Sequence, residues 1–197
     1  MSLSFIDNWT CNHCKQWNIK TKLKVLALLI IITMLMLLTG CADTHNLVRN
    51  NPVSTTKLTP KDSFYIAVSK DVVYGEDKNE GSGLTLSQVI QSSVSKRARR
   101  VEVGTIHESF DDALLHARTK SFKYLIYPTI LHWEDHATEW NGVPDTVEVK
   151  VEIVESAADT VVDTALISGK SGLATFGGDR PQNLLPLPVE EFFSALF

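Results

Sequence analysis

The chain has 197 residues, 44% of them hydrophobic and 21% charged, which is enough for one domain with a buried core. Its first 40 residues hold four lysines and one aspartate, so 15 basic and 22 acidic residues follow and give the remainder a net charge of −7. A surface this acidic disfavours nucleic acid, whose phosphates select basic proteins, and we expect no nucleic-acid partner.

The amino-terminal segment has the pattern of a secretory signal peptide. Lysines precede an uncharged run over residues 25–38, and the small residues Thr39 and Gly40 follow. Basic residues, an apolar core and a small-residue end are the parts of such a signal. A helix over this run spans only about 21 Å of a hydrocarbon layer roughly 30 Å thick, which favours a signal over the alternative of an uncleaved inner-membrane anchor. We predict that residues 1–40, with an extended n-region, are removed.

The sequence Leu38-Thr39-Gly40-Cys41 resembles the lipobox of bacterial lipoproteins. In those proteins a diacylglycerol is attached to the cysteine thiol, the bond before the cysteine is cut, and the new amino terminus is acylated. The resemblance implies cleavage between Gly40 and Cys41 and a covalent lipid, N-acyl and S-diacylglycerol, that anchors Cys41 in a membrane. In lipoprotein sorting, an aspartate after the cysteine favours the inner membrane. Ala42 stands there, which implies the outer membrane, with the domain facing the periplasm.

Residues 41–61 are polar and offer no apolar face, so they predict a flexible tether before a domain over residues 62–197. Cys41 is the only cysteine left after cleavage, so that domain has no disulfide. Apolar periodicity predicts strands at 63–69, 101–106, 122–134, 145–155 and 161–168, and helices at 84–97, from 109 onward and at 188–196. The order β-α-β-α-β-β-β-α predicts an α+β fold whose mixed sheet has helices on one face.

Single residues add detail to three of these elements. Thr85 and Gln88 are spaced to form a capping box at the first helix. Ser109 begins the second helix, with acidic residues in its first turn. Pro128 donates no backbone hydrogen bond, so the long strand around it is expected to be an edge strand or to be kinked there.

The densest group of polar and aromatic side chains lies over residues 132–140. It comprises His132, Trp133, Glu134, Asp135, His136, Glu139 and Trp140. Exposed tryptophans are enriched at interfaces, so Trp133, Glu134, Asp135, His136 and Trp140 are candidate binding residues, and a purely structural role is the alternative for both tryptophans. A metal or hydrolytic site is a further alternative, although histidines four residues apart on one strand stand about 13 Å apart.

A second candidate is the glycine-rich stretch that contains Gly177, Gly178, Asp179 and Arg180. Paired glycines can present backbone N–H groups to an anion, but the lysine and hydroxyl residues of a phosphate loop are missing. The alternative is a tight loop in which Asp179 and Arg180 cap neighbouring elements. No set of catalytic residues emerges, so we expect no enzyme, no bound metal and no cofactor besides the lipid.

Two stretches, YLIYPTILHWEDHATEW from residue 124 and ATFGGDRPQNLLP from residue 174, resemble a family of uncharacterised proteobacterial lipoproteins, domain of unknown function 4823. The resemblance covers roughly residues 60–197 and implies no activity. The element order also resembles small envelope domains related to the amino-terminal domain of the translocation protein TolB, which bind proteins.

These observations lead to the expectation of an outer-membrane lipoprotein whose non-enzymatic periplasmic domain binds another component of the cell envelope, with a protein as the expected partner. The first alternative is an envelope metal-binding protein or hydrolase that uses His132, Asp135, His136 and Glu139. The second is a binder of lipid or glycan that uses the two tryptophans and the basic run over residues 96–100.

Overall fold

The computed structural model describes residues 21–32, 43–50, 57–74, 77–135, 143–172 and 180–197. The chain divides into two compact units, Met1–Cys41 and Ala42–Phe197. In the first unit, residues 21–32 form a helix. Among the described residues, no helix combines the length and the apolar character that crossing a bilayer requires.

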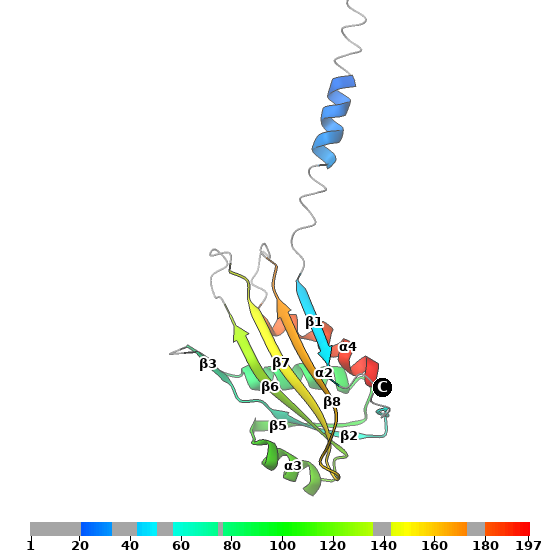
Figure 1. Cartoon of the computed structure of the whole chain (residues 1–197), viewed down its shortest axis with the longest axis vertical. Coiled ribbons are helices and arrows are strands. Elements are labelled where there is room, and N and C mark those ends of the chain that lie inside the picture. Colours follow the sequence, from blue (N-terminus) through cyan, green and yellow to red (C-terminus); the bar gives the residue numbers. More distant parts are fainter. Residues whose placement is uncertain (1–20, 33–42, 51–56, 75–76, 136–142, 173–179) are drawn as a thin grey trace, which may run out of the picture. The chain divides into compact units, whose positions relative to one another are not determined.

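A six-stranded mixed sheet with the order β1-β8-β7-β6-β2-β5 forms the centre of the second unit (Figure 1). Its strands are β1 (Thr44–Arg49), β2 (Ser63–Val68), β5 (Arg100–His107), β6 (Tyr124–Glu134), β7 (Thr146–Glu155) and β8 (Thr160–Lys170). Strand β2 is parallel to both β5 and β6, and the other neighbours are antiparallel. The helices are α2 (Ser82–Val94), α3 (Phe110–Thr119), α4 (Pro186–Leu196) and the 3₁₀ helix η1 (Pro181–Leu184), and β3 (Val72–Tyr74) and β4 (Asp77–Asn79) form a separate hairpin.

The α+β class and the mixed sheet are confirmed, but the helices cover both faces of the sheet. Phe64 and Ile66 belong to the core that includes α2 and α4, whereas Tyr65 and Ala67 pack with α3 on the opposite face. The reason is topological. The crossovers β2–α2–β5 and β5–α3–β6 run in opposite directions along the sheet, and right-handed crossovers in opposite directions place their helices on opposite faces.

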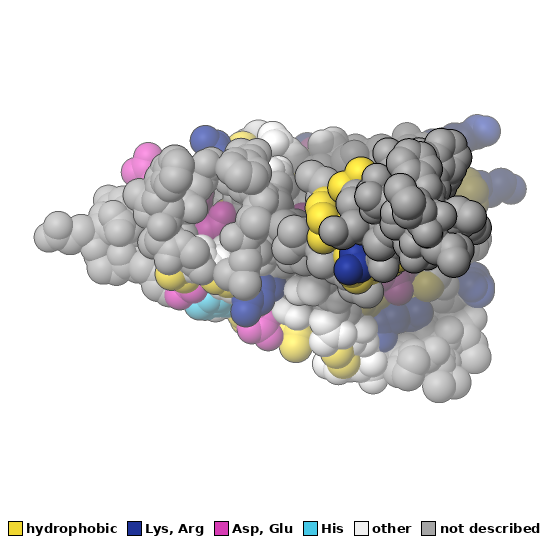
Figure 2. All heavy atoms as spheres, turned by 90° about the horizontal axis from the view of Figure 1, so that it is seen from above, with side chains coloured by type: hydrophobic (Ala, Val, Ile, Leu, Met, Phe, Trp, Pro, Cys, Tyr) yellow, Lys and Arg dark blue, Asp and Glu magenta, His cyan; other side chains and the backbone are white. Residues whose placement is uncertain are grey.

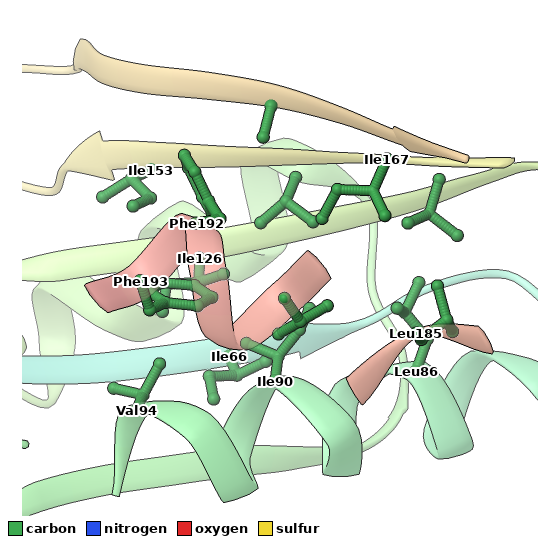
Figure 3. Packing of buried hydrophobic residues seen from close by; sticks show 14 of the residues in the cluster. Ile66, Leu86, Ile90, Val94, Ile126, Ile153, Ile167, Leu185, Phe192 and Phe193 are labelled. Carbon is green, nitrogen blue, oxygen red and sulfur yellow. The ribbon is translucent and has the colours of Figure 1, made fainter. Parts of the chain in front are cut away.

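The main core lies between the sheet and helices α2 and α4. Figure 3 shows Leu86, Ile90 and Val94 projecting from α2 at helical spacing, and Phe192 and Phe193 projecting from α4. All five side chains are fully buried, and the two phenylalanine rings lie 5.1 Å apart between centroids. Full burial of a side chain of this size contributes roughly 1.5–3 kcal/mol, so this layer supplies much of the driving force for folding.

Strand β6 is a central strand, so the prediction of an edge strand at Pro128 is wrong. The proline pairs in register with Val151 of β7. Its missing N–H is tolerated because the ladder between β2 and β6 ends at Ile126, two residues earlier. A register shift follows at Ile130/His132, so the strand carries its irregularity just beyond the proline.

The first helix of the second unit begins at Ser82, so the capping box predicted at Thr85 and Gln88 is wrong. The Asp71 carboxylate instead accepts hydrogen bonds from the N–H groups of Gly81 and Gly83, at 3.0 and 2.8 Å. A carboxylate at a helix amino terminus satisfies the free N–H groups and complements the helix dipole. At α3 the prediction is confirmed, because the Ser109 hydroxyl accepts from the N–H of Asp112.

The tether predicted over residues 41–61 is wrong in two parts. Residues 44–49 form strand β1, which pairs antiparallel with β8. Further along, Leu58 is buried in the main core, and its N–H donates to the carbonyl of Leu196 at 2.9 Å. The composition of residues 41–61 alone cannot predict either contact, because the partners of this segment lie more than a hundred residues away in the sequence.

An ionic contact joins the end of α2, and the residues that directly follow it, to α4. The carboxylate of Glu190 accepts from Arg97, Ser93 and Lys96 at 2.5, 2.9 and 3.1 Å. These donors, Arg97 first, lower the pKa of Glu190 from 4.5 to about 2. A lowered pKa stabilises the fold above the unfolded pKa, and this stabilisation is lost as the pH falls through the folded pKa.

We therefore expect Glu190→Gln to remove part of the loss of stability that the wild-type protein shows between about pH 4.5 and pH 2. Thermal unfolding measured across this range checks the difference between the two proteins. Glu155→Gln, at the end of β7 and distant from Glu190 in the sequence, is the control and should keep the wild-type profile. Parallel pH profiles for Glu190→Gln and wild type would show that the contact does not stabilise the fold.

Candidate functional site

One end of the sheet carries the described residues of the predicted cluster over residues 132–140. Thr44 is in register with Lys170, Lys170 with Thr146, and Thr146 with Glu134. These four residues therefore lie side by side at one end of the sheet. They begin β1 and β7 and end β6 and β8, and we call this end the β1 end of the sheet. Asp135, which is exposed, directly follows it.

Trp133 belongs to the core, so its interpretation as an exposed interface residue is wrong. Its side chain is 3% exposed and packs in the cluster that includes Val147 and Val149. The alternation from Ile126 to Ile130 would turn Trp133 outward, but the register shift at Ile130/His132 reverses the faces. The structural role held open for this tryptophan is the one observed.

His132 and Glu134 share the opposite, partly exposed face of β6. Nε2 of His132 lies 3.4 Å from Oε2 of Glu134, and the Thr146 hydroxyl donates to the same oxygen at 3.3 Å. Within the described ranges, no three His, Cys, Asp or Glu side chains come together as metal ligands would. His136 and Glu139, which complete the predicted metal set, lie outside the described residues.

A shallow hollow of about 430 Å³ lies beside this pair, across β1, β8, β7 and β6. Most of its lining residues are polar or charged, but the greater part of the surface that they present to the hollow is apolar. The lining residues are Thr44, His45, Asn46, His132, Thr146, Val147, Glu148, Ser168, Gly169 and Lys170. Figure 2 shows histidine, acidic and basic side chains on the surface seen from above. A partner could form hydrogen bonds and ion pairs with these residues, because the lining contains both an acidic residue, Glu148, and a basic one, Lys170.

The glycine-rich candidate is described only at Arg180. Its side chain is exposed, and its backbone carbonyl accepts from the N–H of Asn183 at 2.8 Å at the start of η1. This backbone contact makes Arg180 the N-cap of η1 without a hydrogen bond from its side chain. Anion binding and the tight loop therefore both stay predictions. The remaining candidates lie outside the described residues: Gly40, Cys41, His136, Trp140, Gly177, Gly178 and Asp179.

The chain is held in place from two residues after the predicted lipidation site. The carboxylate of Asp43 accepts from the N–H of Gly172 at 3.1 Å. At the other end of β1, the Arg49 guanidinium pairs with Asp163, whose side chain is fully buried, and also lies over the Phe192 ring. The strand that follows Cys41 is therefore an integral part of the fold.

A polar cluster under α3 was not predicted from the sequence. The Tyr65 hydroxyl donates to the Glu108 carboxylate, and Nδ1 of His116 lies 3.2 Å from the second oxygen of that carboxylate. The rings of Tyr65 and His116 stack 4.4 Å apart between centroids. Burial, and then the carboxylate of Glu108, raise the pKa of Tyr65. The alternation of Ser63–Val68 places Tyr65 opposite Phe64 and Ile66, which was the available signal for a second buried face.

Solved structures with a similar fold include PelC from Paraburkholderia phytofirmans. A PelC dodecamer that carries one point substitution matches with a TM-score of 0.58 at 13% identity, over 79% of this chain and 98% of PelC. A second PelC dodecamer matches with a TM-score of 0.57 at 13% identity, over 78% and 97%. Lipoprotein GNA1162 from Neisseria meningitidis is more distant, with a TM-score of 0.40 at 12% identity, over 57% of this chain and 84% of that protein.

No curated protein sequence shows significant similarity to the chain. The sequence family described as domain of unknown function (DUF4823) matches residues 56–196, which is most of the folded unit. The resemblance seen in the two stretches of sequence is thus supported by a match over residues 56–196. The chain belongs to the DUF4823 family.

Proposed function

We propose that this chain is an outer-membrane lipoprotein, lipidated on Cys41, whose periplasmic domain binds another component of the cell envelope and catalyses no reaction. The observation that carries the proposal is the lipobox-like sequence Leu38–Cys41 after an apolar run, followed at once by a folded unit. Two acyl-bearing groups on one residue give stable anchoring, since each buried CH₂ contributes about 0.8 kcal/mol. Ala42 after the cysteine supports the outer membrane.

Binding is supported by the surface that the fold leaves open. Helix α3 packs on β2 and β6, so on that face of the sheet the described parts of β7, β8 and β1 form an accessible surface with the hollow described above, whose residues are mostly polar by type. Polar surfaces of this kind are typical of interfaces that form and dissociate. We infer that the partner contacts this face.

A second copy of the chain is the first partner to test. PelC, which has a similar fold over nearly its whole length, was solved as a dodecamer. In this chain β1 and β5 are the outer strands of the six-stranded sheet, and outer strands have backbone groups that can pair with another chain. Cross-linking resolves whether the partner is the same chain or a different protein.

We expect Cys41→Ser to remove the protein from the outer-membrane fraction and to abolish its cross-links to outer-membrane partners in intact cells, because without the lipid the chain is neither cleaved before residue 41 nor sorted as a lipoprotein. Fractionation, followed by cross-linking and mass spectrometry, measures both effects. A Cys11→Ser/Cys14→Ser variant is the matched control, because both cysteines lie in the segment expected to be removed. Unchanged recovery of Cys41→Ser in the outer-membrane fraction would contradict lipidation.

The non-enzymatic part of the proposal has a separate test. Purified protein is assayed for hydrolysis of envelope esters and peptides with and without zinc, beside His132→Ala. We expect no zinc-dependent turnover in either protein. Turnover that requires zinc and is lost in His132→Ala would overturn this part and favour the metal-dependent alternative.

A further inference from the structure

We propose that the β1 end of the sheet faces and contacts the membrane leaflet that holds the lipid of Cys41, so that the domain is held in one orientation. The partner of this surface is the phospholipid headgroup layer. The proposal rests on lipidation of Cys41, which is part of the proposed function. It is carried by the position of the first strand relative to that residue.

The covalent chain between the lipid and the fold is very short. Only Ala42 and Asp43 separate Cys41 from Thr44, the first residue of β1. Three Cα–Cα steps span at most about 11 Å, even when fully extended. The headgroup region of one leaflet is itself about 6 Å thick, so the start of β1 cannot move far from its outer boundary. A flexible tether of twenty residues would have a mean span of about 25 Å and would leave the domain free to rotate relative to the membrane.

The strand at the end of this short link is fixed to the rest of the sheet. All six residues of β1 pair in register with β8, and Leu47 packs against the main core. Arg49 forms an ion pair with the buried carboxylate of Asp163. The link is shorter still in practice, because the Asp43 carboxylate already accepts a hydrogen bond from Gly172. The anchor therefore holds the sheet itself.

The exposed side chains at this end suit a headgroup layer. Asp43, Thr44, Asp135 and Lys170 are exposed and polar or charged. A lysine can pair with a lipid phosphate, and the carboxylates can accept from the ammonium of phosphatidylethanolamine. Val143, 48% exposed, is the large apolar side chain here. The opposite end of β7 lies nine residues away from Thr146, or about 30 Å, which is well beyond the reach of the headgroups.

Single cysteines test the orientation, because the mature protein has no free thiol once Cys41 is lipidated. Lys170→Cys and Asp135→Cys place a probe at the β1 end, and Ala157→Cys places one in the exposed turn between β7 and β8 at the far end. Each full-length variant is expressed, purified in lipidated form, labelled with a fluorescent maleimide and reconstituted into vesicles of phosphatidylethanolamine and phosphatidylglycerol. Quenching by lipids that carry a nitroxide on the headgroup is then measured.

We expect several-fold stronger quenching at positions 170 and 135 than at position 157. Equal quenching at the three positions, or stronger quenching at 157, would overturn the proposal. Insertion of ten Gly/Ser residues between Ala42 and Asp43 lengthens the link to a mean span of about 20 Å and should reduce the difference between the two ends. An insertion variant that keeps the full difference would show that the short link does not set the orientation.

Failure of the underlying lipidation gives a different result. If Cys41 carries no lipid, protein without an introduced cysteine reacts with maleimide and does not float with the vesicles. If the protein floats and remains unreactive, lipidation holds, and the quenching pattern alone decides the orientation.

Discussion

Replacing Asp163 by alanine is expected to destabilise the folded unit by about 3 kcal/mol and to release β1 from the sheet. The side chain of Asp163 is fully buried and its partner Arg49 is 20% exposed. Without the carboxylate, a guanidinium remains in the interior beside the Phe192 ring, with no counter-charge to offset its lost hydration. The N–H of Thr164 also loses its acceptor, which lies 2.7 Å away.

Urea denaturation measures the loss of stability, and hydrogen exchange locates it. Exchange should increase most in Thr44–Arg49 and in the facing residues of β8. A double variant, Arg49→Met with Asp163→Val, removes both charges and should regain much of the loss. If β1 in Asp163→Ala stays as protected as in wild type, the ion pair is not what holds the strand.

Replacing Gly83 by alanine is expected to cost about 3 kcal/mol, at the upper end of what overpacking usually costs. A Cβ atom at this position would lie 2.0 Å from the carbonyl oxygen of Ser69 and 2.8 Å from its carbonyl carbon. Both are backbone atoms, so the clash is relieved only if α2 moves away from the end of β2. That movement would also disturb the hydrogen bond from Gly83 to Asp71.

Gly81→Ala is the matched control, two residues away. Gly81 has a φ of +84°, but a Cβ there would meet nothing within 4 Å. Only the left-handed backbone opposes this substitution, at a cost of about 1 kcal/mol. Thermal and urea unfolding of the two variants separate the causes. Similar losses for both would show that the close approach of Ser69 to Gly83 costs no more than a left-handed backbone does.

The sequence correctly predicts the strands and helices in which apolar residues recur at regular strand or helix spacing along the whole element. The strand predicted at 145–155 matches β7 almost to its observed bounds, and the helix predicted at 84–97 overlaps most of α2. The parallel pairing of β2 with β5 and β6 is consistent with the expected alternation of strands and helices. Each of these signals is local, so a single sequence contains it.

The features that the sequence did not predict depend on residues far apart in the chain or on the register of paired strands. Strand β1 packs one apolar side chain, Leu47, against the core. Its Arg49 forms an ion pair with Asp163, which lies 114 residues further along the chain. Trp133 was misplaced because one register shift in β6 reverses which side chains face the core. The cluster of Tyr65, Glu108 and His116 combines residues from β2, α3 and the loop before α3, and no spacing in the sequence connects them.

The pairing of β1 with β8 also sets an order of events during biosynthesis. The chain emerges amino terminus first, but Thr44 has to wait for Lys170, 126 residues later, before it can pair. Closing so long a loop is slow compared with forming a local hairpin. During that interval β1 is unpaired. The first strand of the folded unit to be made is thus among the last to be folded in.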